Sequence, residues 1–377
     1  MASIIVLGSG MVGSAMAIDL SKSHSVTATD MDPAILASLA TRCPEVNTLK
    51  LDVTDTQALT QAISSFDLVI CAVPGYLGYD TLRHIIMAGK HVVDISFFPE
   101  DALMLNDLAK EHRVTAIVDC GVAPGMGNLL LGYHNRHMQV ERFECLVGGL
   151  PLVRTWPFEY KAPFSPVDVI EEYTRPARYV ENGHVVVKPA LSDVEHVSFP
   201  QVGTLESFNS DGLRTLITTM SHIPDMKEKT LRYPGHAEKM RVLRDAGFFS
   251  TDPIEVGGSR LAPLAFTSRI LFDNWKLGTE EEEFTVMRVT ISGKDKKGKE
   301  ETWAYTLLDR YDALSKTSSM ARTTGYTATA AAQWLLETQP GLSGVFPPEQ
   351  IGGMDGCADY FLNYLSARNV RYEKQKV

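Results

Sequence analysis

The stretch "SIIVLGSGMVGSAMAIDL", residues 3–20, runs from an apolar strand-like segment through a glycine turn into apolar residues at helical spacing. Gly8, Gly10 and Gly13 form the pattern G-x-G-x-x-G between the two segments. The first glycine of such a unit allows the tight turn, the second lets the backbone approach a pyrophosphate, and the third lets the helix pack on the strand. The helix N-terminus then faces the phosphates. This context favours a dinucleotide-binding turn over a glycine turn that binds nothing.

Asp30 ends the next strand-like segment, about 20 residues beyond the glycines, where a carboxylate accepts hydrogen bonds from an adenosine ribose. It would repel a 2′-phosphate, and the stretch "TDMDP" around it contains no Arg or Lys. The expected cofactor is therefore NAD rather than NADP. Asp52 and Val53 end the third segment and are expected at the adenine, although a plain strand-end cap explains Asp52 as well. The predicted cofactor contacts are Gly8, Gly10, Met11, Val12, Gly13, Asp30, Asp52, Val53, Val73 and Pro74.

Strands and helices alternate through the first third of the chain. We expect further strands within 24–33, 47–55, 67–73, 91–96 and 114–120, and further helices over 33–42, 56–65, 80–89 and 101–112. This alternation indicates parallel βαβ units and a doubly wound Rossmann sheet. The loop "VDCGVAPGMGN", residues 118–128, ends the series, so residues 1–122 are predicted to form an NAD-binding domain.

Later segments are strand-like without regular helices between them. They include "RFECLVGGLP", "HVVVKPAL", "EEFTVMRVTISG" and "ETWAYTLLDRY", and the lysine-rich turn "KDKKGKE" joins the last two as an antiparallel hairpin. Residues 123–325 are predicted to form an α+β substrate domain with a mainly antiparallel sheet. Two helical patterns follow in residues 326–377, and we expect these helices to return to the first sheet.

Composition narrows the classes of protein. The net charge of −10, from 36 Lys+Arg against 46 Asp+Glu, argues against nucleic acid or an anionic membrane as the main partner. Five scattered cysteines show no zinc-site spacing, so no metal site is expected and the thiols are predicted to be reduced. No signal-peptide pattern begins the chain and no apolar run reaches the roughly 20 residues of a membrane span. These features predict a cytoplasmic protein.

Several stretches together resemble the saccharopine dehydrogenase-like family, most closely its lysine 6-dehydrogenase branch. They are "VVDISFFPE", "GVAPGMGN", "VGGLP", "EEYTRPARYVENG", "SDGLRT", "TLRYPGHAEK" and "GVFPPEQI", in order along nearly the whole chain. The resemblance implies an NAD(P)-dependent enzyme that acts at a C–N bond of a substrate held between two domains. That branch oxidises the ε-amine of L-lysine to an aldehyde, which cyclises to a piperideine carboxylate. Saccharopine reductases carry an aspartate where this chain has Ala123, which counts against saccharopine.

Amine oxidation by hydride transfer needs a group that removes a proton from the ammonium. Asp94 ends a strand at the carboxyl edge of the sheet, where active sites of such folds lie. Glu159 lies early in the second domain, and His236 opens a helix. Asp94, Glu159 and His236 are thus the catalytic candidates. Structural roles explain them about as well: Asp94 as a loop cap, Glu159 as part of a surface charge pair, and His236 as the first residue of a helix.

The remaining candidates concern the substrate. Arg214 and Arg232 are candidates to clamp its carboxylate, because a guanidinium binds carboxylates in a bidentate manner. The resemblance matches Phe164, Thr230 and Arg232 to pocket positions. Glu172 stands where some relatives have a histidine, and either pairs with the substrate's amino group or lies on an exposed helix face. The predicted substrate contacts are Tyr160, Phe164, Glu172, Arg214, Thr230 and Arg232.

Three functions remain open at this point. The leading interpretation is NAD-dependent oxidation of L-lysine by a homo-oligomer. The alternatives are a saccharopine-type reductase that makes or breaks a secondary amine, and an NAD-binding regulator without chemistry. Saccharopine has three carboxylates and should need more clustered cations than these candidates offer.

Overall fold

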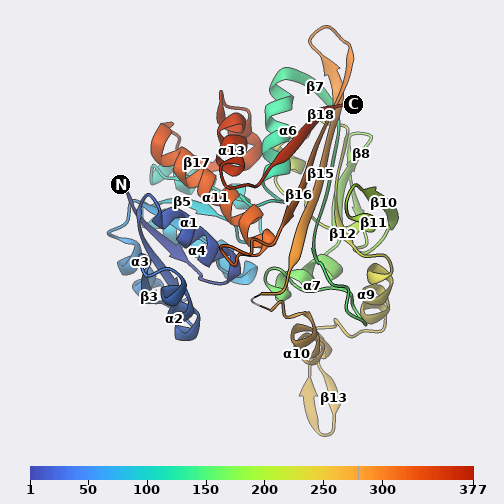
Figure 1. Ribbon diagram of the computed structural model, residues 1–377, viewed down its shortest axis with the longest axis horizontal. Coiled ribbons are helices and arrows are strands. Elements are labelled where there is room, and N and C mark those ends of the chain that lie inside the picture. Colours follow the sequence, from blue (N-terminus) through green and yellow to red (C-terminus); the bar gives the residue numbers. More distant parts are fainter. Residues whose placement is uncertain (279) are drawn as a thin grey trace.

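A computed structural model describes residues 1–278 and 280–377 and shows a parallel sheet beside a larger mixed sheet (Figure 1). The parallel sheet has seven strands in the order β17-β6-β5-β4-β1-β2-β3. Its strands are β1 (Ser3–Leu7), β2 (Ser25–Asp30), β3 (Asn47–Lys50), β4 (Leu68–Cys71), β5 (His91–Asp94), β6 (Thr115–Ile117) and β17 (Gly344–Phe346). The helices between them are α1 (Met11–Ser21), α2 (Pro33–Arg42), α3 (Thr56–Ile63), α4 (Gly75–Met87), the 3₁₀ turn η1 (Ala102–Leu105) and α5 (Asn106–Glu111).

The inner strands of this sheet are apolar along their whole length because both faces are covered. Residues 4–7 of β1 and all of β4 are buried, and separate apolar clusters pack on the two faces. Such continuous apolar strands are typical of doubly wound α/β sheets. The predicted fold class is confirmed.

The parallel sheet also contains a strand from outside residues 1–122. β17 pairs in parallel with β6, with Gly344 opposite Thr115 and Phe346 opposite Ile117. A strand of three residues carries no periodicity that a sequence pattern could reveal. The helix expected over 80–89 also begins earlier, at Gly75, directly after Pro74.

The second sheet has nine strands and is mainly antiparallel, as expected. Its main order is β10-β11-β12-β7-β15-β16-β18, and β8 and β9 attach beside β12. Its strands are β7 (Met138–Pro151), β8 (Ala177–Glu181), β9 (His184–Lys188), β10 (Glu195–Phe199), β11 (Gly203–Asn209), β12 (Asp225–Arg232), β15 (Glu283–Asp295), β16 (Glu300–Arg310) and β18 (Tyr372–Lys376). The predicted lysine-rich hairpin joins β15 and β16, whereas β12 and β7 pair in parallel.

Shorter elements complete the second half of the chain. The helices are α6 (Met126–His137), α7 (Pro166–Thr174), α8 (Leu216–Thr219), α9 (His236–Asp245), α10 (Pro263–Trp275), α11 (Ser319–Thr338), α12 (Pro348–Gly352) and α13 (Cys357–Ser366). A separate hairpin of β13 (Ile254–Val256) and β14 (Ser259–Leu261) projects beyond α10 (Figure 1). None of the helices in the described residues is long and apolar enough to cross a membrane.

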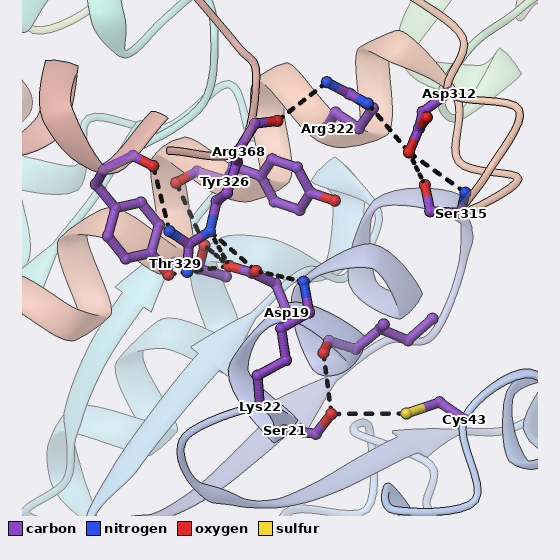
Figure 2. A network of polar contacts seen from close by, with 12 residues as sticks. Asp19, Ser21, Lys22, Cys43, Asp312, Ser315, Arg322, Tyr326, Thr329 and Arg368 are labelled. Atoms are coloured by element: carbon purple, nitrogen blue, oxygen red, sulfur yellow. Dashed lines mark hydrogen bonds and ion pairs between the residues drawn. The ribbon is translucent and has the colours of Figure 1, made fainter. Parts of the chain in front are cut away.

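The C-terminal helices contact the first helix of the chain. α11 packs along α1 and α13 packs on α11. The buried Asp19 carboxylate on α1 accepts hydrogen bonds from Thr329 Oγ1 at 2.8 Å, Tyr364 Oη at 2.9 Å and Arg368 Nε at 2.8 Å (Figure 2). β18 then leaves this group and pairs with β16 in the second sheet. The end of the chain therefore contributes to both halves of the molecule.

Candidate functional site

A cavity of about 610 Å³ lies between the carboxyl edge of the parallel sheet and the second sheet. Its wall includes the glycine turn, the loops that follow β2 to β6, helix α7 and one face of β12. All ten residues predicted to contact a dinucleotide line this cavity. Four of the six predicted substrate contacts also line it, namely Phe164, Glu172, Thr230 and Arg232.

The glycine turn has the geometry that its spacing predicted. Gly8 has a φ of +90°, and a Cβ at Gly13 would lie 1.9 Å from the carbonyl oxygen of Gly8. The helix and strand can therefore approach this closely only if residue 13 has no side chain. A Cβ at Gly10 would meet no protein atom within 4 Å. The open side of Gly10, at the N-terminus of α1, leaves room for a pyrophosphate to approach the backbone.

Asp30 lies beside this turn and is held by the backbone. Its Oδ2 accepts the N–H of Ser9 and its Oδ1 accepts the N–H of Asp32, each at 2.9 Å. Two bonds leave further acceptor capacity on a carboxylate, which suits ribose hydroxyls. The acceptor oxygens of Asp30 therefore fit the adenosine end of a dinucleotide, whose nicotinamide ring would accept a hydride when bound.

Three polar side chains from one strand line the opposite wall. Glu228, Thr230 and Arg232 stand at alternate positions of β12, and alternate residues of a strand point to the same face. Thr230 Oγ1 donates to Ser210 Oγ at 2.8 Å. Glu228 was not predicted from the sequence, although its place two residues before Thr230 was a signal that could have identified it.

Arg232 is held by an acid and an aromatic ring. Its Nη2 lies 2.7 Å from Glu172 Oε2, and its guanidinium carbon lies 4.5 Å from the centre of the Tyr160 ring. Burial raises the pKa of Glu172, and the charge of Arg232 opposes that shift. Tyr160 does not line the cavity, so it supports Arg232 from behind. Arg232 Nε is buried and has no hydrogen-bond partner among the described residues.

Arg214 also lies outside the cavity wall. Its Nε lies 2.7 Å from Asp119 Oδ1 and its Nη1 donates to the carbonyl of Phe98 at 2.6 Å. The guanidinium is thus occupied by groups that follow β6 and β5. Asp119 does line the cavity, and its Oδ2 has no partner among the described residues.

The catalytic candidate Asp94 is buried beneath the cavity wall. Its side chain is fully buried, and its Oδ1 accepts the N–H of Ser96 at 3.0 Å. Burial raises its pKa to about 7. Ser96 lines the cavity but Asp94 does not, because the carboxylate turns back toward Cys71 on β4.

Glu159 and His236 are likewise separated from the cavity. Glu159 forms an ion pair with Arg154. His236 Nδ1 lies 3.0 Å from the carbonyl oxygen of Phe158, which can only accept, so Nδ1 carries the proton and Nε2 accepts from Tyr173 Oη at 2.9 Å. Burial lowers the pKa of His236 to about 3. The imidazole is therefore neutral and both of its nitrogens are occupied.

The substrate side of the cavity is rich in acids. From Asp119 onward, the lining residues include six acids and two arginines in the described part of the chain. The acids are Asp119, Asp168, Glu171, Glu172, Asp211 and Glu228, and the arginines are Arg175 and Arg232. Four of the acids pair with an arginine, whereas no ion pair with Asp168 or Glu228 occurs among the described residues. This balance favours a positively charged ligand.

Comparison with known proteins agrees with this two-part architecture. The family model of the saccharopine dehydrogenase NADP binding domain matches residues 4–117, and that of the saccharopine dehydrogenase C-terminal domain matches residues 121–370. The chain belongs to the saccharopine dehydrogenase family. This confirms the family expected from the sequence stretches.

Curated relatives of this chain include two proteins named as dehydrogenases and one named as a synthase. Saccharopine dehydrogenase [NADP(+), L-glutamate-forming] of Schizosaccharomyces pombe is 27% identical over 264 residues, which cover 66% of this chain and 58% of that protein. Carboxyaminopropylagmatine dehydrogenase of Synechocystis sp. is 24% identical over 387 residues and 93% of both chains. Alpha-aminoadipic semialdehyde synthase of Arabidopsis thaliana is 28% identical over 250 residues, 60% of this chain and 23% of that protein. The matches thus span less than two thirds of the yeast and plant proteins.

Solved structures of low identity share the fold of this saccharopine dehydrogenase family member. Apo saccharopine dehydrogenase (L-Glu forming) from Saccharomyces cerevisiae superposes with a TM-score of 0.79 at 20% identity, over 100% of both chains. Homospermidine synthase from Legionella pneumophila, in complex with NAD, gives a TM-score of 0.69 at 12% identity over 100% of this chain and 91% of that one.

Proposed function

We propose that this protein is an NAD-dependent dehydrogenase that oxidises the ε-amine of L-lysine to an aldehyde and releases ammonia. One observation carries the proposal: a single cavity joins a dinucleotide turn to a wall that carries Arg232 and two acids, Asp168 and Glu228, for which no ion pair occurs among the described residues. Lysine has one carboxylate for that arginine and a distant ammonium for an acid. Because attraction between opposite charges is strong where water is excluded, this arrangement favours a cationic amino acid.

The side chains that line the adenosine end of the cavity support the preference for NAD over NADP. Asp30 lies beside the glycine turn, and Met31, Ile35, Asp52 and Val53 line the same end without a basic side chain. A 2′-phosphate would meet the Asp30 carboxylate and no lining cation there. The matched domain carries NADP in its family description, so the choice of cofactor belongs to this proposal.

A second candidate is a dehydrogenase that forms or cleaves a secondary amine with a cationic arm. The acid-rich wall favours this candidate as much as it favours lysine. Carboxyaminopropylagmatine dehydrogenase of Synechocystis matches 93% of this chain. Saccharopine fits less well because its three carboxylates would face six acids and two arginines that are already paired with acids.

The deciding experiment measures NADH formation with lysine, ornithine, saccharopine, diamines and carboxyalkyl derivatives of agmatine. We expect turnover with lysine that rises with pH, because the bound ammonium must deprotonate before hydride can leave. Lysine labelled at the ε-nitrogen should release labelled ammonia together with NADH. Label retained in the organic product would contradict the proposal. Binding of NAD without turnover of any amine would indicate an NAD-binding regulator without catalytic activity.

A further inference from the structure

Glu228 is an unusual acid for the wall of a cavity, because no ion pair with it occurs among the described residues. Its side chain is 4% exposed, and Oε2 has no hydrogen-bond partner among the described residues. A buried carboxylate without a partner is costly, so proteins rarely keep one that has no role. A Cβ at Gly212 would lie 2.0 Å from Glu228 Oε1, so the carboxylate occupies space that a side chain at residue 212 would fill. Its Oε2 remains an acceptor without a partner among the described residues.

The charged groups around Glu228 come from four neighbouring segments. Burial and the charges of Asp119, Glu172 and Asp211 together raise the pKa of Glu228 to about 8, and the charge of Arg214 opposes that shift. On the adjacent strand β7, Cys145 stands opposite Glu228, and burial raises the pKa of its thiol well above the usual value. The thiol therefore stays neutral. A pKa of about 8 lies near physiological pH, where a group can both accept and return a proton, as general acid–base catalysis requires.

The geometry points to Glu228 as the catalytic base that takes the proton from the reacting nitrogen of the substrate. This inference rests on the proposed amine oxidation. Other groups are less suitable: Asp94 lies behind the wall, both nitrogens of His236 are occupied, and Asp168 accepts the backbone N–H of Gly75. Glu228 lines the same wall as Arg232, four residues away on one strand face.

The reaction proceeds in steps whose atoms and charges balance. The substrate's N–H bond breaks, and the proton passes from the ammonium to the Glu228 carboxylate. As the nitrogen lone pair forms a C=N bond, the adjacent C–H bond would break and its hydrogen would leave with both electrons; an oxidised nicotinamide, when bound, would supply the acceptor for that hydride. Glu228 then returns its proton to the solvent. It next removes a proton from the water that adds to the iminium carbon, and the resulting carbinolamine breaks down to aldehyde and ammonia.

Substitution of Glu228 tests this role through a pH profile. We expect Glu228→Gln to lower kcat with lysine by about 10²–10⁴-fold and to remove the rise of kcat/KM near neutral to mildly alkaline pH. Glu228→Asp should recover part of the rate, and NAD binding should be unchanged in both. Glu159→Gln is the matched control, because it removes a carboxylate that lies outside the cavity. A Glu228→Gln enzyme with the wild-type rate and profile would overturn the assignment.

A measurement without turnover provides an independent test. Lysine is titrated calorimetrically into the complex with NADH, which cannot accept a hydride, at pH 7 in buffers of different ionisation enthalpy. An ammonium beside Glu228 favours its carboxylate, so the wild type and Glu159→Gln should release protons on binding and Glu228→Gln should not. Equal proton release in all three would exclude Glu228. A wild type that binds NAD but oxidises no amine would refute the proposed function itself, and the role of Glu228 with it.

Discussion

The role of a single residue in this protein depends on the groups that its side chain contacts. Arg232, Glu172 and Tyr160 form one buried unit, in which the arginine bonds the acid and stacks on the ring. Removing one member of such a unit leaves the others without compensation. Asp30 differs, because its oxygens are held by backbone N–H groups that remain whatever its side chain binds.

Asp30→Ala should narrow the preference for NAD over NADP. The substitution removes a ribose acceptor and a charge that repels the 2′-phosphate, so the kcat/KM with NAD should fall while that with NADP rises or holds. Steady-state kinetics with both cofactors measures the ratio. Asp107→Ala is the control, since the Asp107 side chain is exposed and lies outside the cavity. A wild type that prefers NADP would contradict this prediction.

Arg232→Ala should raise KM for lysine while NAD affinity stays the same. Truncating one partner of a buried charge pair costs about 2–5 kcal/mol, which corresponds to about 30-fold or more in KM. Because the change strands Glu172, the double variant Arg232→Ala/Glu172→Gln should regain stability without regaining affinity. Arg154→Ala, which breaks a pair outside the cavity, is the control. An unchanged KM would indicate that Arg175, rather than Arg232, binds the substrate carboxylate. Arg175 Nη1 has no hydrogen-bond partner among the described residues.

Elements differ in how well the sequence predicted them. The first strand, the glycine turn and α1 were predicted because a tight turn between a strand and a helix requires glycine at three fixed positions for steric reasons. β17 was missed because three residues carry no period, and α4 began early because Pro74 favours the start of a helix. Periodicity therefore identified long elements and failed at short edges.

Substitutions of two glycines in the turn should affect protein stability and NAD binding differently. Gly13→Ala should destabilise the protein by about 1–3 kcal/mol and weaken NAD binding, because its Cβ would overlap the backbone of Gly8 at 1.9 Å. Gly10→Ala should leave the melting temperature nearly unchanged and weaken only NAD binding, since its Cβ meets no protein atom. Thermal unfolding and NAD titration measure the two effects. Equal melting temperatures for both variants would argue against this division.

The whole molecule depends on contacts between its two ends. Asp19 on α1 receives bonds from α11 and α13 and from Arg368 just beyond α13, while β17 joins the first sheet and β18 the second (Figures 1 and 2). The C-terminal segment therefore stabilises the arrangement around the cavity without lining its second-sheet wall.

Loss of Arg368 should destabilise the molecule more than loss of Lys22. Both cations pair with Asp19, but the Arg368 side chain is 22% exposed and that of Lys22 is 63% exposed. Breaking a buried pair costs about 3 kcal/mol or more, whereas an exposed pair contributes at most about 1 kcal/mol. Chemical denaturation of Arg368→Ala and Lys22→Ala measures the difference. Equal losses would show that Thr329 and Tyr364 suffice to hold Asp19.

Local steric and charge requirements allowed the sequence by itself to determine the doubly wound sheet, the glycine turn and the place of Asp30. The ten residues predicted around the nucleotide line one cavity because they all follow from the ends of parallel strands. The tertiary structure alone decided which polar side chains face the substrate. His236 is occupied by Phe158 and Tyr173, and Arg214 by Asp119, through contacts 63 to 95 residues apart in the chain. Glu228 Oε2 has no hydrogen-bond partner among the described residues. Whether a buried polar group is neutralised or left free depends on neighbours that only folding brings together.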